Sequence, residues 1–227
     1  MLKTRSDKYK KSVTKSDKKE SYSVKEAVEF AQKSSYSKFP GSLDLVVNLN
    51  IDPTKNDQRI NVITNLPFQT GKAKRILVLC APDSQAEAKK AGADEVMGVE
   101  GIAKIEGGYL DFDILIATPD MMVELAKIAK ILGPKGLMPN PKNNTVTTSL
   151  ATAIGSHKKG QLSLKMKEAP MIQTQVGKVD QDPSEVSQNI QHVIEIIRAN
   201  KPTKVKGILI KSVFLAPTMG PSFKLSI

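Results

Sequence analysis

The sequence has few of the residues that build disulfide, metal or catalytic sites. Cys80 is its only cysteine, and His157 and His192 are its only histidines. A single thiol cannot form an internal disulfide, and this set does not supply the usual ligands of a zinc cluster. Neither histidine stands in a recognisable nucleophile-and-base motif. We therefore expect no disulfide framework, no metal, no cofactor and no enzymatic activity.

Aromatic residues and long apolar runs are also scarce. Tryptophan is absent and aromatic residues make up 4% of the chain. Most single-strand binders stack bases on aromatic rings, so this composition favours phosphate contact and shape reading instead. No window approaches the length of a membrane span, and the basic start at Met1 to Arg5 lacks an apolar signal stretch. We expect a soluble cytoplasmic protein with no membrane partner.

Positive charge is abundant and unevenly placed. Against 34 Lys and Arg there are 23 Asp and Glu, a formal charge of +11, which points to a polyanionic partner. Residues 1–20 carry eight basic and three acidic side chains, 125–167 carry eight lysines and no acid, and 201–227 carry five lysines and no acid. Between them, residues 83–124 carry ten acidic groups against three lysines, and we expect that stretch to face away from a nucleic acid.

The two ends of the chain have a pattern different from its middle. Residues 1–22 are polar and lack periodicity, which predicts an extended or partly disordered basic arm. Capping signals predict helices that begin after Ser23 and after Asp182. Alternating apolar residues predict strands, the first two forming a hairpin around a turn at 52–57. The predicted strands cover residues 43–51, 59–64, 162–166, 172–176, 206–214 and 223–227.

The middle of the chain predicts a different architecture. Residues 75–80 and 112–118 are nearly continuous apolar runs, typical of parallel strands buried on both faces. Helices are expected at 84–91 and from Pro119 to about Ile131. We therefore predict an α/β protein of two domains: a discontinuous split α+β sandwich from 1–66 and 158–227, and an inserted Rossmann-like three-layer α/β domain at 67–157.

A parallel α/β segment raises the alternative of a nucleotide-dependent enzyme. The turn after the first buried strand, Ala81-Pro82-Asp83-Ser84, has no glycine fingerprint and carries an acid where phosphate would sit. The Gly133 to Gly136 segment lacks the ending of a P-loop. Both observations disfavour this rival.

Two strings stand out as candidate binding segments. Ile131 to Lys142 contains two glycines and three prolines, which predicts a rigid loop that displays Lys130, Lys135 and Lys142. Ala216 to Ser222 predicts a tight turn, in which Gly220 would allow close approach and Thr218 would offer a hydroxyl. A connector and a plain turn are the alternative interpretations of these two strings.

With these strings, the sequence resembles the family of the bacterial-type large-subunit ribosomal protein L-one over essentially the whole chain. The resemblance implies a structural protein of the large ribosomal subunit that binds the ribosomal RNA of the mobile stalk, at a stem with an asymmetric internal loop. It also implies assistance in the release of deacylated exit-site tRNA and translational repression through the messenger RNA of its own operon. The location implied is the ribosome, in a bacterial cytoplasm or in an organelle such as a plastid. The strings that carry the resemblance are Lys8-Tyr9, Lys38-Phe39, Asn50 to Pro53, Asp57-Gln58, Leu66-Pro67, Gly71-Lys72, Ala91 to Asp94, Asp111 to Asp113, Ala117 to Asp120, Leu132 to Lys142, Val176 to Lys178, Lys201-Pro202, Lys206-Gly207 and Thr218 to Ser222.

The resemblance also implies which residues contact RNA. Lys38 would contact phosphate and Phe39 would pack on ribose or the exposed loop. Ser212 and Thr218 would form hydrogen bonds to RNA. Met219 and Gly220 would form the wall that the RNA approaches closely. The implied set is Lys38, Phe39, Lys178, Ser212, Thr218, Met219 and Gly220, with Lys130, Lys135 and Lys142 as a secondary RNA contact.

Two segments depart from the family pattern. Pro40-Gly41-Ser42 follows Phe39 where the family usually has an acidic residue. Val179-Asp180-Gln181 follows Lys178 where the family commonly has Ser-Phe.

Overall fold

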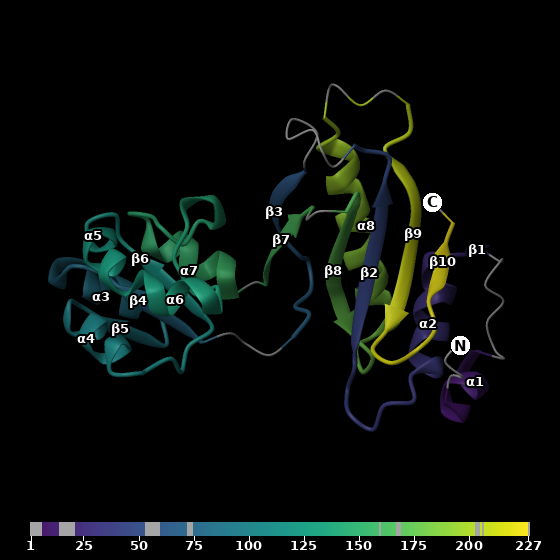
Figure 1. The fold of residues 1–227 in the computed structure, drawn as a ribbon, viewed down its shortest axis with the longest axis horizontal. Coiled ribbons are helices and arrows are strands. Elements are labelled where there is room, and N and C mark those ends of the chain that lie inside the picture. The colour runs from purple at the N-terminus through teal and green to yellow at the C-terminus, as the bar shows by residue number, and fades with distance from the viewer. Residues whose placement is uncertain are drawn as a thin grey trace. The chain divides into compact units, whose positions relative to one another are not determined.

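The computed structural model divides the chain into two compact units (Figure 1). Unit 1 comprises Met1–Gly71 and Leu162–Ile227, and unit 2 comprises Lys72–Gln161. The predicted boundaries at 66/67 and 157/158 lie a few residues before these divisions. The structure describes residues 6–13, 21–52, 60–71, 75–158, 160–166, 169–202, 205 and 207–226. In these residues no helix is long and apolar enough to cross a membrane.

Unit 1 is built on a five-stranded sheet with the strand order β1-β10-β9-β2-β8. The short β1 pairs parallel with β10, and every other pairing in this sheet is antiparallel. Along β2 and β9 alternate residues are buried, so the sheet has one face in the core and one partly open to solvent. The strands are β1 (Ser21–Tyr22), β2 (Ser42–Leu49), β8 (Met171–Lys178), β9 (Ile210–Pro217) and β10 (Phe223–Leu225).

Two helices, α2 (Val24–Ser34) and α8 (Pro183–Ala199), pack against each other and against this sheet (Figure 1). The capping signals predicted both starts correctly. Ser23 and Glu26 form a capping box at α2, and the Asp182 carboxylate accepts from the Ser184 backbone N–H at 3.0 Å. The buried residues of α8, including Val193 and Ile197, join the inner face of the sheet in one core. The terminal segments thus form the predicted α+β unit.

Two predictions for unit 1 were wrong. The arm was predicted to be extended or partly disordered, but it contains a helix, α1 (Asp7–Val13). The acidic Asp7 in the first turn stabilises this helix by its interaction with the positive end of the helix dipole. The segments at 43–51 and 59–64 do not form a hairpin, because β3 (Asn61–Asn65) pairs with β7 (Gln161–Lys165) and β2 lies between β8 and β9. Most of the turn predicted at 52–57 lies outside the described residues.

Unit 2 has a parallel sheet of three strands, ordered β5-β4-β6. These are β4 (Ile76–Leu79), β5 (Glu95–Met97) and β6 (Ile114–Ala117). Every residue of β4 is buried, as the continuous apolar run predicted. Leu77 and Leu79 join one apolar cluster, and Ile76 and Val78 join another on the opposite face. The first cluster includes residues of α4 (Glu100–Glu106) and α5 (Met121–Leu125), the second residues of α3 (Pro82–Lys90) and α7 (Leu150–Lys158). This is the predicted three-layer α/β architecture.

The helix and loop predicted after β6 take a different form. After α5 the chain continues as a 3-10 turn, η2 (Ala126–Ile128), and as α6 (Ala129–Lys135). Pro134 therefore lies inside a helix, in a segment that was predicted to be a loop. The helix α6 ends at Gly136, which has a φ of 71°, a left-handed conformation that glycine adopts without steric cost. Burial of Leu132 in the unit 2 core holds this last helical turn in place.

Candidate nucleic-acid interface

The turn at the end of β9 is anchored to the start of β2. The Pro217 carbonyl accepts from the Gly220 N–H at 3.0 Å, which closes the turn. The Thr218 hydroxyl accepts from the Ser42 N–H at 3.0 Å and donates to the Ser42 carbonyl at 3.1 Å. The Thr218 N–H donates to the same carbonyl at 2.9 Å. The three bonds between Thr218 and Ser42 join residues that lie 176 positions apart in sequence.

The anchoring gives Thr218 a structural role. A hydroxyl has one hydrogen to donate, and here the Ser42 carbonyl accepts it. Thr218 is thus a positioning residue of the turn, with one acceptor lone pair left for a ligand. Its partner residue, Ser42, belongs to the Pro40 to Ser42 segment that departs from the family pattern.

Two glycines permit this close packing, and they do so inside the protein. A Cβ at Gly220 would lie 2.4 Å from the Pro217 Cγ. A Cβ at Gly41 would lie 3.2 Å from the Thr218 Cβ. Gly220 was expected to allow close approach of RNA, and here it allows close approach of Pro217. The role of Gly41 could not be predicted, because its contact partner Thr218 comes from the other end of the chain.

Met219 and Phe39 are the exposed apolar side chains of this region. Met219 is 60% exposed and has a φ of 68°, a left-handed conformation that non-glycine residues rarely adopt. Phe39 is 57% exposed in the loop between α2 and β2. That loop is held by the Ser37 hydroxyl, which donates to the Phe39 carbonyl at 2.9 Å. These two exposed side chains lie on segments that are joined through Gly41, Ser42 and Thr218.

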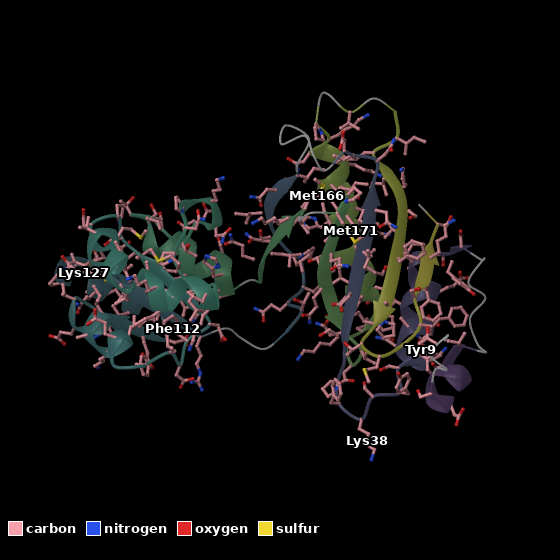
Figure 2. All side chains as sticks on the ribbon, in the orientation of Figure 1. Tyr9, Lys38, Phe112, Lys127, Met166 and Met171 are labelled. Atoms are coloured by element: carbon pink, nitrogen blue, oxygen red, sulfur yellow. The ribbon has the colours of Figure 1, made fainter. Side chains whose placement is uncertain are left out.

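Lys38 and Lys178 supply positive charge on segments that adjoin Ser42. Lys38 is exposed and extends away from the ribbon at the tip of its loop (Figure 2). Lys178 is the partner of Ser42 in the β2–β8 pairing. Ser42 therefore stands between Lys178 on one side and Thr218 on the other. We call this convergence of residues 38–42, 178 and 217–220 the Thr218 surface.

Gln181 holds the segment around Lys178 by hydrogen bonds. Its side-chain oxygen accepts from the Lys178 N–H at 2.9 Å, and its backbone carbonyl accepts from the Gln32 side chain at 2.7 Å. The Gly41 carbonyl accepts from the Val179 N–H at 2.9 Å. Of these bonds, the one to the Gln181 side chain depends on the departure at 179–181, and it could not be predicted from the sequence.

Ser212 does not join the Thr218 surface. It lies near the other end of β9 and its hydroxyl accepts from the Asn48 amide at 3.0 Å. Six residues of strand separate it from Thr218, or about 20 Å at about 3.4 Å per residue. The structure thus divides the implied set into the Thr218 surface and a separate region around Ser212.

One acidic side chain lies on the outer face of the same sheet. Asp44 pairs with Ala216 on β9 and with Gln175 on β8. Burial raises the pKa of Asp44 above its ordinary value of 3.8. A carboxylate in this position opposes the approach of phosphate. Because its pKa is raised, this carboxylate becomes neutral at a higher pH than an ordinary aspartate does.

The three lysines of the secondary contact are all exposed in unit 2. Lys130 and Lys135 lie on α6, and Lys142 lies in a 3-10 turn, η3 (Pro141–Asn143). The Asn140 side chain caps that turn by accepting from the Lys142 N–H at 2.9 Å. The lysines are therefore displayed on ordered backbone, as predicted, although half of the predicted loop is helical.

Comparisons with known proteins agree on one family. The Ribosomal protein L1p/L10e family matches residues 11–221. A protein of Mycoplasmoides gallisepticum, named large ribosomal subunit protein uL1, is 42% identical over 211 residues, which cover 93% of this chain and 92% of that protein. Proteins of the same name from Bacteroides thetaiotaomicron and Lactobacillus johnsonii are 41% and 39% identical, over 90% and 96% of this chain and 88% and 94% of their own length.

Proposed function

Because the chain belongs to the ribosomal protein L1p/L10e family, it is a structural, non-enzymatic constituent of the large ribosomal subunit, and we propose that its Thr218 surface binds the ribosomal RNA of the stalk. The resemblance found in the sequence is confirmed at the level of the family. The observation that carries the proposal is the anchoring of the Met219 turn beside the Lys38-Phe39 loop through Ser42 and Thr218.

The surface offers each kind of contact that a folded RNA loop requires. Lys38 and Lys178 supply positive charge for phosphates, Phe39 supplies one exposed ring, and Met219 supplies an adaptable apolar contact to a sugar or a base edge. Because the segments are already held by hydrogen bonds, little conformational entropy remains to be lost on binding.

Replacement of the two exposed apolar side chains tests this proposal. We expect Phe39→Ala and Met219→Ala to weaken binding of a stalk ribosomal RNA fragment by about 1 to 3 kcal/mol each. Their free energies of unfolding should change little, because both side chains are more than half exposed. Val99→Ala, at a side chain that is also 60% exposed but belongs to unit 2, is the matched control. Unchanged RNA affinity in both variants would refute the site.

We further propose that the same surface binds the messenger RNA of the protein's own operon. A single surface cannot hold both RNAs at once, so the stalk fragment should displace the operon leader in a competition assay. Phe39→Ala should weaken both complexes in parallel. Simultaneous binding of the two RNAs to one protein would exclude a shared site.

We propose a secondary RNA contact at the unit 2 lysines and a role of the protein in the release of deacylated exit-site tRNA. The support is three exposed cations on ordered backbone at Lys130, Lys135 and Lys142. Ribosomes that carry the Lys135→Gln, Lys142→Gln variant should release exit-site tRNA more slowly than wild-type ribosomes. Equal rates would leave these lysines without a role in release.

A further inference from the structure

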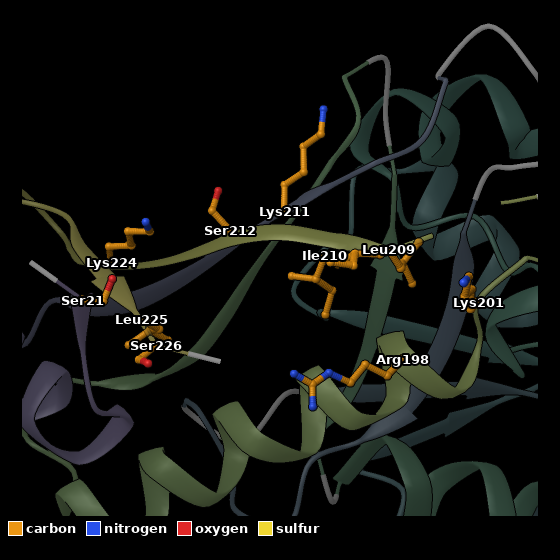
Figure 3. A pocket seen from close by; sticks show the side chains of 11 residues that line it. Ser21, Arg198, Lys201, Leu209, Ile210, Lys211, Ser212, Lys224, Leu225 and Ser226 are labelled. Atoms are coloured by element: carbon orange, nitrogen blue, oxygen red, sulfur yellow. The ribbon is translucent and has the colours of Figure 1, made fainter. Parts of the chain in front are cut away.

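A second candidate site lies at the end of the unit 1 sheet, away from the Thr218 turn. A pocket of about 490 Å³ opens between the last turn of α8, the start of β9 and the end of β10 (Figure 3). Its rim includes Ser212, the one member of the implied set that the Thr218 surface leaves out. The pocket therefore offers a structural context for that residue.

The lining of the pocket is strongly basic. Arg198, Lys201, Lys211 and Lys224 line it, and no acidic side chain is among its described lining residues. Within the described part of the chain, no carboxylate pairs with the Arg198 guanidinium. Lys201 is held by a hydrogen bond from its Nζ to the Gly207 carbonyl at 2.7 Å. Several cations around one hollow, among them a guanidinium that pairs with no carboxylate of the described residues, are suited to an anion.

A β-bulge directs additional side chains toward this region. The pairing of β2 with β9 shifts so that Asn48 faces Ser212 and Leu49 faces Ile210, which leaves Lys211 without a partner on β2. Lys211 and Ser212 accordingly extend from one side of β9, while Ile210 and Arg198 lie on the other (Figure 3). Bulges commonly re-aim side chains at functional sites. Arg198 thus lines the pocket from the α8 side of β9, and Lys211 lines it from the opposite side.

The remaining lining indicates which anion would fit. Leu209, Ile210 and Leu225 supply aliphatic surface, and Ser212 and Ser226 supply hydroxyls. Aliphatic and hydroxyl groups suit a ribose, whereas no aromatic ring is among the described lining residues on which a base could stack. The pocket has the chemistry for a sugar and its phosphate, without the means to read a base.

We propose that this pocket holds a backbone phosphate and ribose of the RNA that unit 1 binds, with Arg198 as the principal phosphate contact. The inference rests on the proposed function and adds a second contact region to it, about 20 Å along β9 from the Thr218 turn at about 3.4 Å per residue. The pocket adds affinity and orientation, and the Thr218 surface recognises the internal loop.

The test compares Arg198→Gln with Lys165→Gln, which removes one exposed charge from β7 of the same unit. Affinity for the stalk RNA fragment is measured between about 50 and 200 mM salt, where loss of one phosphate contact lowers the slope of log K against log salt by about 0.9. Wild-type affinity should therefore fall about threefold more over this range than that of Arg198→Gln. An RNA with a substituted internal loop should show the same loss on Arg198→Gln, because the contact is sequence-independent.

Three outcomes would overturn the inference. An unchanged slope in Arg198→Gln, together with weakened binding in Phe39→Ala, would leave the proposed function standing without the pocket. Equal slope changes in Arg198→Gln and Lys165→Gln would show a general effect of net charge. Calorimetric binding of adenosine monophosphate that depends on Arg198, with unchanged RNA binding, would assign the pocket to a free nucleotide. If the wild-type protein does not bind the RNA fragment, the proposed function itself fails.

Discussion

Replacement of Thr218 by valine separates a structural role of its hydroxyl from direct contact with RNA. Valine has nearly the shape of threonine but lacks the oxygen that accepts from the Ser42 N–H and donates to the Ser42 carbonyl. The Ser42 carbonyl keeps the Thr218 N–H as a donor at 2.9 Å. The Ser42 N–H loses its side-chain acceptor, and this loss dominates the effect.

The magnitude follows from that unpaired donor. An N–H left without an acceptor away from water costs about 1 to 3 kcal/mol, and the carbonyl that retains one partner adds little. We therefore expect Thr218→Val to lower the free energy of unfolding of unit 1 by about 1 to 3 kcal/mol. RNA affinity should fall as a consequence, because the turn that displays Met219 is no longer fixed to β2.

Two measurements on the same variant distinguish the alternatives. Hydrogen exchange of the Ser42 amide should become faster in Thr218→Val and remain near the wild-type rate in Thr218→Ser, which keeps the hydroxyl. RNA binding should follow the same order. Lost RNA affinity with unchanged Ser42 protection and unchanged unfolding would refute the positioning role and restore a direct contact.

Three further predictions concern the same sheet end. Gly220→Ala should destabilise unit 1 more than Gly41→Ala in urea unfolding, because its Cβ would lie 2.4 Å rather than 3.2 Å from the nearest atom. Met219→Gly should weaken RNA binding without destabilising the protein, because glycine tolerates the φ of 68°. Asp44→Asn should stabilise the protein at neutral pH. Because the pKa of Asp44 is raised in the folded protein, ionisation of this group lowers the free energy of unfolding of the wild type as pH rises from 3.8 through the folded pKa. The difference in stability between the wild type and Asp44→Asn should vanish below pH 3.8.

Local signals account for the parts of the fold that could be predicted. The capping box at Ser23 and the cap at Asp182 each satisfy backbone donors within a few residues, so their sequence pattern fixes where α2 and α8 begin. The four buried residues of β4 form a continuous apolar run, because a parallel strand with helices on both faces has no solvent side. These features require no knowledge of distant partners.

Strand pairing could not be predicted in the same way. The segments that form β2 and β3 are adjacent in sequence and both alternate, which is also the pattern of a hairpin. The actual partners of β2 are β8 and β9, from the far end of the chain. Alternation of apolar residues indicates that a strand has one buried face, and it does not indicate which strand pairs with it.

The candidate site shows the same division between local and distant information. Lys38, Phe39 and Met219 were identified as candidates from the resemblance, and all three are exposed. The roles of Gly41 and Gln181 were missed, because their contacts with Thr218 and with Gln32 join segments far apart in sequence. Only the assembled sheet shows that glycine and glutamine are needed there.

The hydroxyl and the thioether of adjacent residues therefore have different tasks in this turn. Thr218 directs its polar group inward to Ser42, and this anchor supports a left-handed backbone at Met219. That conformation costs free energy in a non-glycine residue, and strained backbone persists where the surroundings over-determine it. The turn displays a long, adaptable side chain at 60% exposure, next to the bonds that join it to the start of β2. Stability and RNA recognition thus depend on neighbouring residues through separate interactions, so substitutions at 218 and 219 should affect them in different proportions.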